Sequence, residues 1–278
     1  MKRWAAVLLC VGFIGSTQVV GAVSARKSVE ASMMLTGSLE LAADGSVSSY
    51  ALDRQDLQPE IADLIKRNVA TWRFKAQDGG TLPGKTSMLL RLVAKPVGDG
   101  NFGVSIVGAN FGEKDPASSI SFKDRQWPKY PDMARHAKAG GIAYLMLRVD
   151  RSGHVTDAAV AQVDLTSVSS DSDMRTLRTV LGDAAMRAAQ NWTFNLPTQG
   201  PHANDASWVV RVPVNFHMRD QGLPDKDGWM AYIPGPRQEI PWLAAYRASI
   251  AGAVDTSSEE TPSLVGTGPV LTTPLNQG

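Results

Sequence analysis

The sequence predicts an α+β protein of two tandem modules, each a small antiparallel sheet with a helix packed on one face. Three observations predict this fold class. A pattern of residues between 39 and 93 returns in the same order between 147 and 213. Each copy has a hairpin signal followed by apolar residues at helical spacing. The closing segment of the second copy alternates apolar and polar side chains, as a half-buried strand does.

Residues 1–25 have the arrangement of a secretory signal peptide. Lys2 and Arg3 precede the apolar run 4–14, and small residues follow near Ala22 and Ala25, where we expect cleavage. The alternative is an uncleaved anchor in the inner membrane, because 4–25 is long enough to span a bilayer. The only cysteine, Cys10, lies in this segment, so the mature chain is expected to contain no disulfide.

The first module is predicted at 33–111. A strand at 39–41 leads through the turn sequence DGS at 44–46 into a return strand, which is a hairpin signal. Leu57, Ile61, Leu64 and Ile65 follow at helical spacing, with a proline near the start. The helix ends in the sequence TWRF at 71–74, and 102–111 predicts one additional strand.

The second module is predicted at 128–218 and repeats these features. TWRF at 71–74 returns as NWTF at 191–194, and a strand at 147–149 again precedes a glycine turn. Apolar residues at helical spacing predict a helix over 177–188. Because the Trp-x-Phe segment recurs at the end of each helix, its aromatic rings are better explained by core packing than by a ligand-stacking platform.

The closing strand of the second module is predicted to have one buried and one solvated face. Its apolar residues are Trp208, Val210, Val212, Val214 and Phe216, and they alternate with Arg211, Pro213, Asn215 and His217. A proline cannot donate a ladder hydrogen bond, so Pro213 favours a position at the edge of the sheet. Arg91 and Arg211 occupy equivalent positions, where they either steer an acidic peptide or prevent edge-to-edge aggregation.

The remaining segments are predicted to be connections. We expect a polar linker at 112–127, and an irregular, proline-containing extension at 219–254 with a short helix over 242–250. From 255 to 278 Thr, Ser, Glu, Pro and Gly dominate, and this composition predicts a disordered tail.

The second module resembles the C-terminal domain of TonB energy transducers. The resemblance rests on PKYP at 128–131, GHV at 153–155, WTF at 192–194 and the closing strand 209–216, in the family's order. The first module resembles the same domain more weakly over 33–96 and lacks the Tyr-Pro sequence. The resemblance implies a periplasmic module that binds extended peptides or envelope proteins, typically outer-membrane receptors, and transmits force.

Two departures from the family argue against force transduction. Such transducers carry a membrane anchor and a long proline-rich spacer before the domain, and no such spacer precedes 128. The family's polar residue before Pro-x-Tyr-Pro, which contacts the receptor peptide, is replaced by Trp127. The sequence therefore predicts binding rather than transduction.

We expect a partner to bind in two places. An extended peptide can pair with the closing strand through main-chain hydrogen bonds, and the aromatic residues beside that strand can anchor a partner. The predicted partner-binding residues are Trp127, Tyr130, Pro131, Val209, Arg211, Pro213 and Asn215. The partner would be an envelope protein or extended peptide, and TonB-dependent receptors are one class of such proteins. A homodimer is a further expectation.

The composition and motifs argue against an enzyme and against a nucleic-acid-binding protein. The 278 residues include 28 basic and 27 acidic ones, a net charge of +1 that gives no field to attract nucleic acid. No nucleophile elbow or phosphate loop is present, and the four histidines lack metal-ligand spacing, so we expect neither cofactor nor metal. The alternatives to a binding protein are a passive envelope scaffold, whose sheets pair with each other, and a secreted hydrolase with an unrecognised site.

Overall fold

The computed structural model describes residues 28–76, 81–112, 117–200, 202–218, 225, 228–243, 263–264 and 269–276. The predicted signal peptide, 1–25, lies outside these residues. The α+β prediction is confirmed, because the described chain combines antiparallel sheets with few helices. None of the helices in the described ranges is long and apolar enough to cross a membrane.

The first module forms a five-stranded sheet in the order β11-β1-β4-β5, in which β11 spans Met230–Tyr232 and β2 pairs with the other part of β1. The additional strand predicted at 102–111 is present as β5. The elements of this module are β1 (Glu30–Leu41), β2 (Val47–Leu52), α2 (Pro59–Thr71), β3 (Phe74–Lys75), β4 (Lys85–Gly98) and β5 (Asn101–Phe111).

The second module forms a four-stranded sheet in the order β12-β10-β7-β8, in which β12 spans Ser263–Leu264, and lies beside a two-stranded pair of β6 and β9. Its long helix begins at a serine cap, because the Ser170 hydroxyl accepts a hydrogen bond from the Asp173 amide. The elements are β6 (Ser121–Asp124), α3 (Asp132–His136), β7 (Gly141–Asp150), β8 (Val155–Leu165), α4 (Asp171–Ala189), β9 (Thr193–Asn195) and β10 (Ser207–Phe216).

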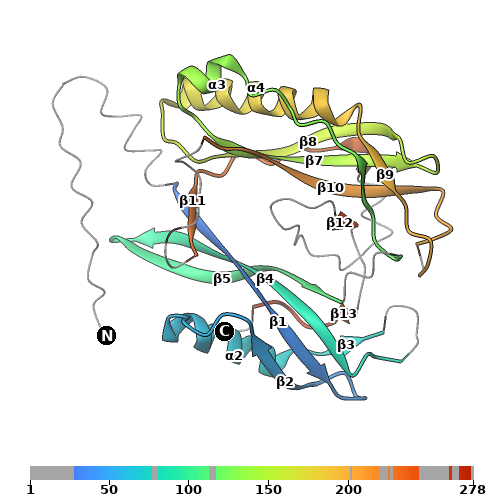
Figure 1. The fold of residues 1–278 in the computed structure, drawn as a ribbon. Helices are drawn as coiled ribbons and strands as arrows, with labels where there is room; N and C mark the ends of the chain where they lie inside the picture. The colour runs from blue at the N-terminus through green and yellow to red at the C-terminus, as the bar shows by residue number, and fades with distance from the viewer. Residues whose placement is uncertain are drawn as a thin grey trace.

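The two sheets lie between two outer layers of helix (Figure 1). Helix α4 packs on β8 and β7 in a core that includes Leu181 and Trp192, whereas α2 contacts β2 and β5 in a core that includes Ile65 and Trp72. Between the sheets, Ile142 and Tyr144 form a small apolar cluster with Met230. The modules therefore present their helices outward and their sheets toward each other.

Both modules hold the hairpin turn against the Trp-x-Phe strand in the same way. Gly45 and Gly153 both have a φ of 83°, and the amides of Phe74 and Phe194 donate to their carbonyl oxygens at 2.8 and 2.9 Å. A Cβ atom on either glycine would collide with the phenylalanine carbonyl oxygen. Glycine is therefore required at both turns by conformation and by space.

The prediction for the faces of β10 is half right. Trp208, Val210, Val212, Val214 and Phe216 are all buried in the core beneath α4, as expected. The prediction that the opposite face is solvated is wrong, because Val209, Arg211 and Pro213 are buried and Asn215 is partly buried. The reason is tertiary packing, since this face meets the first module and Leu243 of the C-terminal extension.

The extension after the second module joins both sheets. Its strand β11 (Met230–Tyr232) pairs with the start of β1, and Ile233 exchanges backbone hydrogen bonds of 2.7 and 3.0 Å with Leu165 of β8. The Gln238 amide then donates to the Ala161 carbonyl at 2.8 Å. The helix predicted at 242–250 lies almost entirely outside the described residues.

Two segments predicted to be unstructured contain strands. In the predicted linker, β6 pairs with β9, and Phe122 stacks on Phe194 with ring centroids 5.0 Å apart. In the predicted disordered tail, β12 (Ser263–Leu264) pairs with β10, and β13 (Val270–Leu271) pairs with β3. Composition failed here because these short strands are stabilised by partners distant in the sequence.

Candidate functional site

The outer side of β10 is the main candidate for binding a partner. On its inner side β10 pairs with β7 along its whole length, from Ser207 to Phe216. On its outer side, the described part of the chain contributes two residue pairs, Val210 with Leu264 and Arg211 with Ser263. Unpaired backbone N–H and C=O groups along an edge are a template for another strand.

The equivalent strand of the first module has no such side. β4 pairs with β1 from Lys85 to Ala94 on one side and with β5 from Met88 to Gly98 on the other. Its ladder is therefore occupied on both sides over most of its length.

The Arg211 side chain lies between the two sheets rather than in solvent. Its guanidinium stacks over the Tyr144 ring, 4.2 Å from the centroid, and Arg91 of the first module lies 6.0 Å from the same centroid. Only 9% of Arg211 is exposed. The predicted solvent-facing position is thus wrong, and Arg211 contributes to the contact between the modules.

A buried carboxylate completes this interface. Asp164 on β8 accepts hydrogen bonds from Gln162 Nε2 at 2.7 Å and from the Gly235 amide at 2.9 Å. Burial raises the pKa of the Asp164 carboxyl, and these two hydrogen bonds oppose the rise. The carboxylate thereby fixes the C-terminal extension to the second module.

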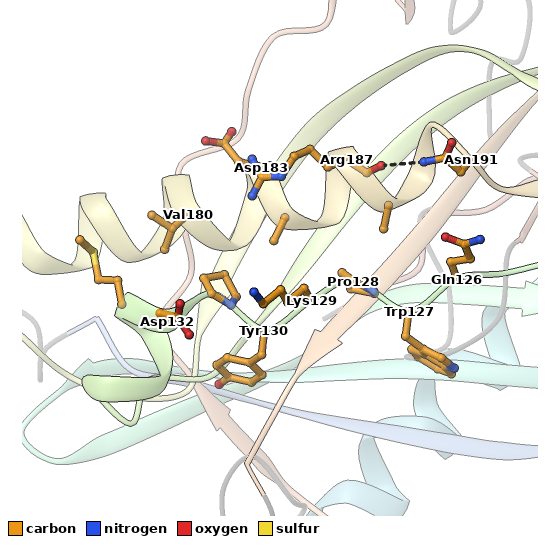
Figure 2. Close-up of a pocket in the computed structure, with 14 residues that line it drawn as sticks. Gln126, Trp127, Pro128, Lys129, Tyr130, Asp132, Val180, Asp183, Arg187 and Asn191 are labelled. Atoms are coloured by element: carbon orange, nitrogen blue, oxygen red, sulfur yellow. Dashed lines mark hydrogen bonds between the residues drawn. The ribbon is translucent and has the colours of Figure 1, made fainter.

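The Tyr-Pro segment, residues 126–133, crosses beside α4 and borders a groove of about 570 Å³ (Figure 2). Tyr130 is anchored, because its hydroxyl donates to the Ala139 carbonyl at 2.8 Å and its ring packs edge-on against Phe216. Pro131 is the N-cap residue of α3. Both residues thus have structural contacts that account for their positions.

Trp127 differs from these two residues because 67% of it is exposed. The Arg125 guanidinium lies 3.9 Å from the centroid of its ring and also over Phe122. The neighbouring Gln126 carbonyl accepts a hydrogen bond of 2.8 Å from Trp192 Nε1. The structure therefore holds Trp127 on the surface, while its neighbour is tied to the core.

The predicted binding residues fall into two separate groups. Val209, Arg211, Pro213 and Asn215 share the inter-sheet side of β10, whereas Trp127 lies on the Tyr-Pro segment. Within the described ranges, Tyr130 provides the aromatic contact between this segment and β10. In the same ranges, no group of three His, Cys, Asp or Glu residues is placed to hold a metal ion.

The pairing of β12 with the outer side of β10 was not predicted from the sequence. Nothing in the composition of 255–278 distinguishes Ser263 and Leu264 as a strand. At Ser263 and Leu264 the apolar run is only Leu264-Val265, which is too short to predict a strand.

Comparisons with known proteins agree with the geometry of the second module. Residues 126–218 match the family model described as the Gram-negative bacterial TonB protein C-terminal. Two curated relatives, each named Protein TonB and from two strains of Xanthomonas campestris pv. campestris, are 38% identical over 97 residues. The match covers 35% of this chain and 37% of each relative, so the chain spans little more than a third of their length. No solved structure matches significantly. The predicted resemblance of the second module to the TonB C-terminal domain is therefore confirmed over residues 126–218.

Proposed function

We propose that the second module binds an extended peptide of an envelope protein as an added strand on the outer side of β10. The observation that carries this proposal is the unequal pairing of β10, which is complete toward β7 and, among the described residues, consists of two residue pairs on the other side. An extended peptide placed there gains main-chain hydrogen bonds without requiring a preformed pocket.

The partner we propose is a periplasm-exposed segment of an outer-membrane receptor of TonB-dependent transport. Support comes from the family match of 126–218 and from the relatives named Protein TonB. The protein would act in the periplasm as a non-enzymatic binding protein. The predicted signal at 1–25 would export it there, or hold it at the inner membrane if uncleaved.

We further propose that the two modules are copies of one unit with different roles. The shared glycine turns, the Trp-x-Phe strands and the helix on one face of each sheet support this. Because β5 occupies the side of β4 that corresponds to the outer side of β10, the first module would serve as a scaffold.

Peptides with a chemically modified backbone test whether the partner binds through main-chain hydrogen bonds. Peptides that cover the periplasm-exposed plug segments of TonB-dependent receptors are titrated into the full chain by calorimetry. We expect one segment to bind, and alternate N-methylation of its backbone to abolish binding, because the methyl groups remove the donors that a ladder needs. The same peptide N-methylated at the intervening positions, whose N–H groups point away from β10, keeps the donors of the ladder and serves as control.

Hydrogen exchange identifies where the peptide binds. Amide protection should rise along 207–216 and stay constant along β4, whose two sides are already paired. A peptide that binds without added protection in β10 would exclude the proposed mode. Protection of 207–216 that grows with protein concentration in the absence of peptide would instead favour a scaffold that dimerises through this side.

A further inference from the structure

We infer that residues 263–264 of the chain's own tail are a built-in competitor that the partner peptide must displace from β10. This inference rests on the proposed function, since it concerns the same side of the same strand. β12 pairs antiparallel with β10 through Val210 and Arg211, near the middle of the strand. A peptide strand that extended across this position could not pair there while β12 remained.

The tail is held close to β10 by contacts with the first module. β13 pairs with β3, and the Thr272 amide and hydroxyl each donate to the Arg73 carbonyl at 2.8 Å. The Asn276 side chain accepts from the Ile106 amide at 2.9 Å and donates to the Ile106 carbonyl at 2.7 Å. With its far end fixed six residues beyond Leu264, β12 would return to β10 at a high effective concentration.

The pairing of β12 is short enough to be displaced. It covers two residues of β10, whereas β7 pairs with the strand from Ser207 to Phe216. A longer peptide gains further hydrogen bonds above and below this position, and each is worth a modest net stabilisation. By contrast β5, which holds the equivalent side of β4 from Asn101 to Phe111, is a full strand of the fold.

The tail would therefore set how much of β10 a peptide must pair with before it binds. Short or poorly matched segments would lose to the tethered tail, while a segment that pairs along more of β10 would replace it. The contacts of β13 and Asn276 need not break in this exchange, so the tail would re-engage when the peptide leaves. The effect of the tail is therefore a lower apparent affinity at an otherwise complete site.

Prolines in β12 test the competition. The double variant Ser263→Pro/Leu264→Pro removes the amide donor that β12 directs at β10, whichever of its two residues carries it. We expect it to bind the receptor peptide about three- to tenfold more tightly than the wild type, because about one net hydrogen bond no longer opposes binding. Thr267→Pro, in the same tail but outside β12 and β13, is the control and should leave the affinity unchanged.

A reversible lock provides the second test. In a Cys10→Ser background, Arg211→Cys/Ser263→Cys places two thiols at directly opposite positions of the two strands. Oxidised with glutathione disulfide, this variant should lose peptide binding, and reduction with dithiothreitol should restore it. The single variant Arg211→Cys, treated in the same way, can form only the mixed disulfide with glutathione, so it controls for loss of the guanidinium and for this adduct, and it should keep more peptide binding than the oxidised double variant.

The outcomes separate the two proposals. If the wild type binds the peptide and the double proline variant binds it equally well, the competition is excluded and the proposed function stands. If the locked form binds as well as the reduced form, the peptide does not use this position of β10. If neither the wild type nor any variant binds a receptor peptide, the proposed function fails, and the competition fails with it.

Discussion

The two modules have similar cores but differ in how the outer side of the closing strand, β4 or β10, is paired. In the first module β5 pairs with β4 along most of its length, and in the second module the described residues of β12 pair with the middle of β10. The core tryptophans differ as well. Trp192 Nε1 donates to the Gln126 carbonyl, whereas Trp72 Nε1 has no hydrogen-bond partner within the described residues. The module with the Tyr-Pro segment thus has the hydrogen-bonded core tryptophan and, within the described residues, the less completely paired strand side.

The largest expected effect tests whether the two cores are equally important. Trp72 and Trp192 are 0% and 1% exposed. Replacing either with alanine should cost about 3–5 kcal/mol of unfolding free energy, because each leaves a large cavity. Urea denaturation followed by circular dichroism measures this cost. A much smaller loss for Trp72→Ala would show that the first core contributes little to stability.

The next effect concerns the glycine turns that the modules share. Gly45→Ala and Gly153→Ala should each cost about 2 kcal/mol or more, since both positions combine a positive φ with a collision. Gly100→Ala is the matched control, because Gly100 has a φ of 75° but nothing within 4 Å of an added Cβ. Equal losses at Gly100 and Gly153 in thermal melts would mean that the close approach of the phenylalanine carbonyl contributes nothing.

A smaller effect separates the two tryptophans. Phenylalanine fills most of the same space but cannot donate a hydrogen bond. Trp192→Phe should therefore cost about 1 kcal/mol more than Trp72→Phe, because only Trp192 loses a bond. The difference between the two midpoints in urea gives this value, and equal midpoints would remove the claimed distinction between the cores.

The last prediction concerns pH and the contact between the modules. Burial raises the pKa of Asp164 above its ordinary value of 3.8, so the folded protein holds this proton more tightly than the unfolded chain. The stabilisation that Asp164 contributes by holding this proton is then fully present below pH 3.8 and is lost as the pH rises through the raised pKa. Asp164→Asn should remove this part of the pH dependence, and unfolding free energies of both proteins from pH 3 upward measure it. Parallel curves for the two proteins would contradict the prediction.

Local patterns were sufficient to predict the parts of each module that the chain builds from neighbouring residues. The hairpin glycines, the helix near 177–188 and the helix-facing residues of β10 follow from turn chemistry and periodicity. The opposite face of β10 was mispredicted because Arg211 is polar yet buried, with its charge stacked over Tyr144. Alternation indicates which residues differ in polarity, and it does not reveal that a second sheet covers the polar side.

The pairing of β10 could be predicted only in part. Pro213 and the closing strand indicated an edge, whereas within the described residues β12 pairs with β10 on that side. The short strand β12 could not be predicted, because two residues carry too little periodicity and their pairing depends on contacts about 50 residues away in the sequence. The binding role of the Tyr-Pro segment stays a prediction, and Tyr130 also has a hydrogen bond that fastens its own loop.

Strand β11 has a consequence for how this chain is completed during synthesis. Domains commonly fold in the order in which the ribosome releases them. Here the sheet of the first module receives its last strand from Met230–Tyr232, and Asn276 binds the backbone of β5. These residues are translated after the whole second module. The first module is therefore translated first, but its sheet is completed last. A nascent chain that stops after β10 has a first sheet without its final strand.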